Sequence, residues 1–138
     1  MKTILEKELE SLNNSLIEMG TLIEIAIDRA ITALKIQDKQ LAASVAEYEH
    51  RVNAMEKSIE STAMRLLLSH QPVAKDLRLV STALKLITDM ERIADQAFDI
   101  SEITIYLLDE KFIKEPDLIV EMALKTVEMV KSSLDAFV

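Results

Sequence analysis

Apolar residues recur at alternating intervals of four and three along the first quarter of the chain, the heptad spacing of a helix that packs along one seam. The seam contains Leu5, Leu9, Leu12, Leu16, Met19, Ile23, Ala26, Ala30 and Ala33. It predicts a helix over residues 2–36. Gly20 lies inside this helix, either as a tolerated residue that costs about 1 kcal/mol relative to alanine or as a notch for a packed neighbour.

A second segment, residues 41–66, has the same heptad spacing of apolar residues and predicts a second helix. Asp38 precedes it, and its carboxylate is suited to accept the free amides of a first helical turn. The helix is expected to end near His70, because Gln71-Pro72 follows and the residue before a proline avoids helical dihedrals. The short turn predicts that the second and third helices form an antiparallel pair.

The third predicted helix spans residues 72–108 and carries two apolar rows. A helix with two rows contacts two neighbours, so this one is expected to lie at the centre of the bundle. We therefore predict an all-α protein: a three-helix bundle over residues 1–109, a charged linker over 110–116 and a fourth helix over 117–138. Pro116 suits the start of that last helix.

Composition supports long helices and few turns. The 138 residues include one glycine, two prolines and no cysteine, so tight turns are scarce and disulfides and thiolate metal sites are excluded. Hydrophobic residues make up 49% of the chain but aromatic residues only 4%, so the core must be aliphatic.

The net charge of −8 narrows the classes of partner that the protein is expected to bind. An acidic surface repels nucleic-acid phosphates and anionic lipid, so we expect no nucleic-acid binding and only indirect membrane contact. No apolar run reaches the ~18 residues of a membrane span, and the N-terminus has no signal-peptide core. These features predict a cytoplasmic protein.

An acidic strip follows one side of the third predicted helix. Glu91, Asp95 and Asp99 are spaced i, i+4, i+8, which places them on consecutive turns of one face. Clustered carboxylates repel one another, and a bound Mg, Ca, Mn or Fe ion would offset that repulsion. The alternative is a solvated strip that Arg51 or Arg92 neutralises.

Carboxylates on the other predicted helices are expected at the same level along the bundle as this acidic strip. Counting back from the predicted turns places Glu47 opposite Asp95, and it places the acidic pair of Glu24 and Asp28 on the first helix at a similar level. Glu47-x-x-His50 also matches half of the ligand pattern of di-iron carboxylate bundles, so a metal-binding protein of that type is an alternative.

Motifs of catalysis are missing from the chain. A single glycine cannot build a phosphate-binding loop or a nucleophile elbow, and nothing marks a catalytic triad. We therefore expect a protein that is not an enzyme, acting as a binding partner or, as another alternative, as a plain helical scaffold.

Two motifs together resemble the signature of the PhoU family. They are the run from Gln71-Pro72 to Asp76-Leu77-Arg78 and the run Glu91-Arg92-Ile93-Ala94-Asp95, and Val52-Asn53 with Glu56 is similar to the family pattern as well. The resemblance covers nearly the whole chain. It implies two tandem three-helix repeats, of which this sequence holds the first and the start of the second.

The resemblance also implies a function. Members of the family repress the phosphate-starvation response and are thought to link a phosphate ABC transporter ATPase to a sensor histidine kinase. Some bind iron or zinc at an acidic motif whose first copy corresponds to Glu91 and Asp95, and Asp99 falls outside it. With only one helix of the second repeat present, either the sequence is a piece of a longer chain or the exposed fourth helix drives formation of a homodimer or larger homo-oligomer.

Overall fold

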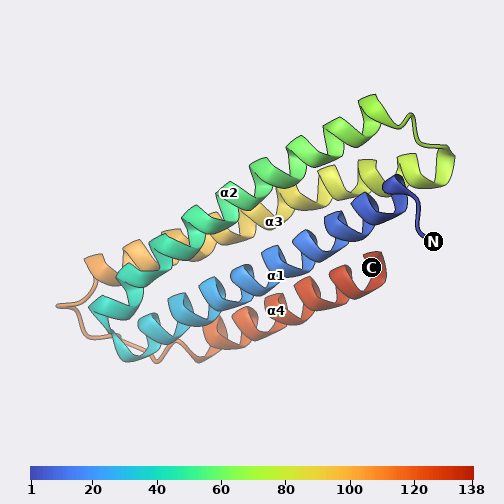
Figure 1. The fold of residues 1–138 in the computed structure, drawn as a ribbon. Helices are drawn as coiled ribbons and strands as arrows, with labels where there is room; N and C mark the ends of the chain where they lie inside the picture. The colour runs from blue at the N-terminus through green and yellow to red at the C-terminus, as the bar shows by residue number, and fades with distance from the viewer.

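The computed structural model describes residues 1–138 and contains four long α-helices and no strand. The helices are α1 (Ile4–Ile36), α2 (Lys39–Ser69), α3 (Ala74–Tyr106) and α4 (Asp117–Phe137). Each helix lies alongside its neighbours as an elongated bundle, and the two ends of the chain lie at the same end of it (Figure 1). The all-α bundle predicted from the sequence is confirmed.

Side chains begin the first two helices where the sequence provides caps. Thr3 accepts the amide of Glu6, and the Glu6 carboxylate accepts the amide of Thr3, which completes a capping box. Asp38 accepts the amide of Leu41 at 3.0 Å, as expected from the sequence. Gln37 ends α1 in a left-handed conformation. Its Nε2 donates a hydrogen bond of 2.8 Å to the carbonyl oxygen of Glu110 in the α3–α4 connector.

The centre of the bundle is α1, so the prediction that the third helix is central is wrong. Helix α1 packs against each of the other three helices, whereas α4 makes substantial contact with α1 only (Figure 1). The reason is that α1 buries residues outside its heptad seam, such as Leu22 and Ile27. The second row of α3 is only partly covered, because Leu77 at its start is exposed.

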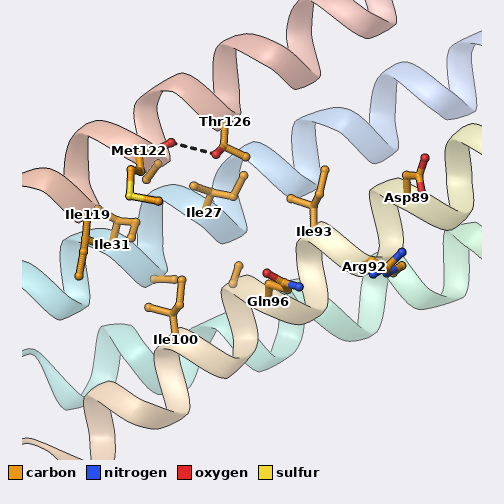
Figure 2. Close-up of a pocket in the computed structure, with 13 residues that line it drawn as sticks. Ile27, Ile31, Asp89, Arg92, Ile93, Gln96, Ile100, Ile119, Met122 and Thr126 are labelled. Atoms are coloured by element: carbon orange, nitrogen blue, oxygen red, sulfur yellow. Dashed lines mark hydrogen bonds between the residues drawn. The ribbon is translucent and has the colours of Figure 1, made fainter.

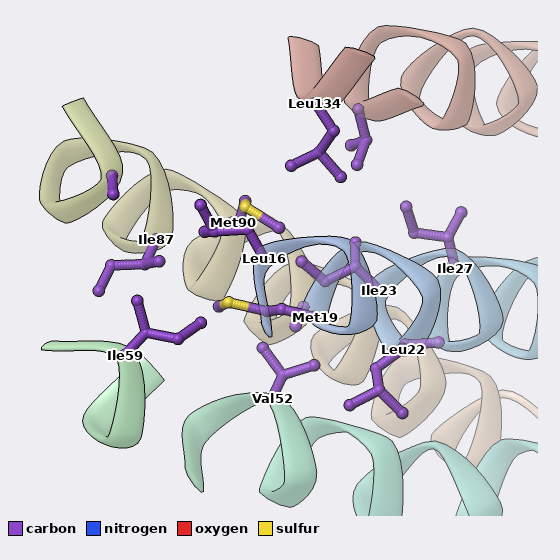
Figure 3. Close-up of a cluster of buried hydrophobic side chains, with 14 of the residues drawn as sticks. Leu16, Met19, Leu22, Ile23, Ile27, Val52, Ile59, Ile87, Met90 and Leu134 are labelled. Atoms are coloured by element: carbon purple, nitrogen blue, oxygen red, sulfur yellow. The ribbon is translucent and has the colours of Figure 1, made fainter. Parts of the chain in front are cut away.

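A continuous aliphatic core runs between the helices. Leu16, Met19 and Ile23 of α1 meet Val52 and Ile59 of α2 on one side and residues of α3 on the other (Figure 3). Leu16 and Ile23 have no exposed surface. Burial of aliphatic side chains from three helices in one cluster stabilises the folded bundle.

Gly20 is the notch through which α4 approaches α1. A β-carbon at this position would overlap the side chain of Leu134, which is buried against it. Of the two interpretations that the sequence left open, packing is therefore the one that the structure supports. None of the four helices combines the length and the apolar composition needed to cross a bilayer.

Candidate carboxylate site

Helices α2 and α3 bring several carboxylates together at mid-height of the bundle. Glu91 and Asp95 lie on consecutive turns of α3, and both are half-buried. Their charges and those of Glu49 and Glu56, which are half-buried on α2, act on one another. The pair predicted from the i, i+4 spacing is thus one half of a cluster that spans two helices.

Glu91 is the most strongly perturbed group of this cluster. The hydrogen bond that it shares with the Asp95 carboxyl, its burial and the charges of Asp95, Glu56 and Glu49 together raise its pKa to about 7, and the hydrogen bond contributes most. The pKa of Glu56 is also raised, first by burial and then by the charges of Glu60 and Asp95. Near neutral pH this site can therefore hold or release a proton.

Asn53 adds a buried acceptor beside the carboxylates. Its Nδ2 donates a hydrogen bond of 2.7 Å to Oε1 of Glu49, while its own Oδ1 is buried and has no donor. A buried oxygen without a partner costs free energy, and a bound cation would satisfy it. Two carboxylates on α3 and an amide oxygen on α2 are the hard ligands that divalent cations prefer.

The oxygen donors of this cluster are of the type that binds divalent cations, but they do not converge on one point in this structure. No three carboxylate or imidazole side chains converge closely enough to hold one ion. The residues that would hold an ion after rearrangement of their side chains are those of the cluster: Glu49, Asn53, Glu56, Glu91 and Asp95. A bound ion would supply positive charge that compensates the repulsion among these carboxylates.

The other carboxylates predicted from the sequence lie elsewhere. Asp99 is exposed one turn beyond Asp95. Glu24 contacts Nζ of Lys131 on α4 at 4.0 Å, and Asp28 is exposed, so the expected convergence of the first helix with Glu91 is wrong. The reason is that this face of α1 packs against α4 and not against the groove between α2 and α3.

The half di-iron motif does not form a ligand set either. Glu47 is exposed, and the side chain of His50 is 79% exposed at 3.5 Å from Glu49. The residues that were missed are Glu49 and its partners on α2. Their spacing Glu49-x-x-x-Asn53-x-x-Glu56 follows one helical face and was a usable signal.

An apolar groove lies on a different side of the bundle. It has a volume of about 450 Å³, with Ile27 and Ile31 of α1 at its floor and α3 and α4 as its walls (Figure 2). Ile93 and Ile100 extend from α3, and Met122 faces them from α4 (Figure 2). None of the residues that line the groove belongs to α2 or to the carboxylate cluster.

Comparison with known proteins places the chain among relatives of the same bundle. The PhoU domain model matches residues 16–104. The chain is 37% identical, over 99% of its length and 63% of the relative, to the phosphate-specific transport system accessory protein PhoU homolog of Clostridium acetobutylicum. It is 36% identical to the accessory protein PhoU of Escherichia coli, over 94% of this chain and 54% of that one.

A solved structure agrees with these sequence matches. The crystal structure of PhoU from Pseudomonas aeruginosa superimposes with a TM-score of 0.90 at 33% identity, covering 95% of this chain and 63% of that one. The chain thus spans between half and two thirds of the length of these relatives. Sequence, fold and the family model agree that this chain belongs to the PhoU family.

Proposed function

We propose that the chain is a negative regulator of phosphate uptake and of phosphate-starvation signalling. In this role it acts as an adaptor between a phosphate ABC transporter ATPase and a sensor histidine kinase, and it is not an enzyme. The observation that carries the proposal is the family match over residues 16–104, together with relatives that are accessory proteins of phosphate-specific transport. The apolar groove between α3 and α4 supports it by offering a contact surface.

The adaptor role is tested by binding. The 138-residue chain, carrying an affinity tag, is mixed with the purified transporter ATPase and with the cytoplasmic part of the histidine kinase from the same cell. Capture of both partners, weakened by a charge in the groove such as Met122→Glu, is the expected result. Capture of neither partner by the parent chain contradicts the adaptor role.

The carboxylate cluster is proposed to bind a metal ion, with iron or zinc first and magnesium or manganese as further candidates. The support is the donor set of Glu91, Asp95 and the unpartnered Oδ1 of Asn53. Replacing Glu91 and Asp95 together with alanine is expected to lower bound metal at least tenfold, because loss of a single residue that only supports a metal ligand already costs roughly 10–100-fold in affinity. The measurement is elemental analysis of protein purified without chelator.

A matched control exists for this double variant. Glu24 and Asp28 form another i, i+4 acidic pair, on α1 and away from the cluster. Their double alanine variant removes the same charge and is expected to keep its metal. Equal metal content in the parent and both variants shows that the cluster is no metal site. A metal-storage bundle of the di-iron type, the second candidate, requires at least two ions per chain in the parent.

Self-association is the remaining part of the proposal. Ile119, Met122 and Met129 of α4 are exposed by 46%, 60% and 69%, although α4 is packed against α1. With Thr126 between Met122 and Met129, these side chains form a row at intervals of three and four that contains no charged residue, so α4 of a second copy can pack there despite the net charge of each copy. Light scattering after gel filtration is expected to give a dimer or larger mass, and a strict monomer at high concentration excludes it.

A further inference from the structure

Two arginines flank one tyrosine on the side of the bundle where α1 and α2 pack together. The guanidinium carbon of Arg29 on α1 lies 4.8 Å from the centre of the Tyr48 ring on α2. The guanidinium carbon of Arg51, one turn after Tyr48, lies 5.6 Å from the same centre. Cation–π attraction to the ring holds both side chains at this place.

Neither arginine has a carboxylate partner. The ion pairs of the chain involve Lys2, Arg65, Lys125, Lys131 and the two histidines, and no Asp or Glu oxygen lies within 4.0 Å of Arg29 or Arg51. This is unexpected in a chain with 24 acidic and 16 basic residues. Two cations held beside one ring also repel each other, and an anion that contacts both would offset that cost.

Most of the hydrogen-bond donors of this group are unused. Nη1 of Arg29 donates to Oγ of Ser44 at 3.0 Å, and Oγ of Ser44 donates to the carbonyl of Leu41 at 2.6 Å. Arg51 and the hydroxyl of Tyr48 donate to no acceptor in the protein. A guanidinium carries five N–H donors in a planar fork that matches the oxygens of an oxyanion.

We propose that Arg29, Tyr48 and Arg51 form a binding site for a phosphoryl dianion. A phosphate group carries a charge of about −1.5 to −2 at pH 7, which comes close to compensating the two guanidinium charges, whereas a carboxylate would leave one of them uncompensated. The Tyr48 hydroxyl adds a neutral donor. The site is distinct from the carboxylate cluster, because Glu49 and Asn53 belong to the α2–α3 side, and it does not depend on the regulatory role proposed above.

The test is an NMR titration of the whole 138-residue chain at fixed ionic strength. Inorganic phosphate, O-phosphoserine and acetate are added separately, and the amides of residues 29, 44, 48 and 51 are followed. Saturable shifts with the phosphoryl compounds are expected. Arg51→Gln is expected to weaken the binding about tenfold, the loss of one charge-assisted hydrogen bond, and it should fold normally because Arg51 is exposed.

Arg78→Gln is the matched control, since Arg78 is an exposed arginine whose only hydrogen bond is to its own helix. It removes the same charge and should leave the affinity unchanged. Saturation by inorganic phosphate identifies the free ion as a ligand, and saturation by phosphoserine alone identifies a phosphorylated molecule. The proposal is overturned if acetate binds equally well, if Arg78→Gln weakens binding as much as Arg51→Gln, or if nothing saturates.

Discussion

Replacing Leu16 with alanine is expected to lower the free energy of unfolding by about 3 kcal/mol. Leu16 is completely buried in α1, the helix that contacts the other three, and lies within the aliphatic cluster of Figure 3. Removing its branched end leaves a cavity that side chains from several helices line and cannot all fill. Urea unfolding followed by circular dichroism measures the change.

The neighbouring isoleucine provides the control for Leu16. Ile17 is 46% exposed, so Ile17→Ala removes a similar volume without creating a cavity and should cost less than about 1 kcal/mol. Equal losses for the two variants would mean that α1 is not the central helix of the bundle in solution.

Stability is expected to fall as the pH rises from about 4.5 to about 7 because of Glu91. The fold raises the pKa of this carboxyl from 4.5 to about 7, so the folded state favours the protonated form. The penalty is absent below the unfolded pKa, grows through this window and is complete above it. Solvent screening limits its size to about 1 kcal/mol.

The variant Glu91→Gln removes that titration. Compared with the parent in metal-free buffer, it is expected to have the same stability near pH 4.5 and to be more stable by about 1 kcal/mol at pH 8. Asp99→Asn, which changes an exposed carboxyl one turn beyond Asp95, should leave the pH profile of the parent in place. A parent and a Glu91→Gln variant with parallel profiles from pH 4 to 8 would falsify the assignment to Glu91.

The helices could be predicted because their signals are local. Heptad rows, the Asp38 cap and the Gln71-Pro72 break act within a few residues, and the helices observed lie within the predicted segments. Which helix lies at the centre of the bundle could not be predicted from such local signals. Helix α3 has two apolar rows in the sequence, but which helix is central depends on where α4 lies, and α4 docks on α1 at the Gly20 notch. Whether α4 begins a second repeat stays a prediction.

The candidate site was predicted on one helix and missed on the other. The i, i+4 spacing of Glu91 and Asp95 requires no knowledge of neighbours. Pairing α3 with α2 does require it, because the turn length fixes the register only to within a few residues. The expected neighbours Glu47 and Arg51 therefore lie two and five residues, roughly half a turn and one and a half turns, before the observed Glu49 and Glu56.

The one-sided attachment of α4 has a consequence for hydrogen exchange. Only Val130 and Leu134 of this helix are buried, whereas α1 has twelve buried residues. Helix α4 can therefore open as a separate cooperative unit while the bundle of α1, α2 and α3 stays closed. Its amide protons should exchange through this partial opening, and the exposed Gly20 surface of α1 would then become available to any helix able to place a leucine there.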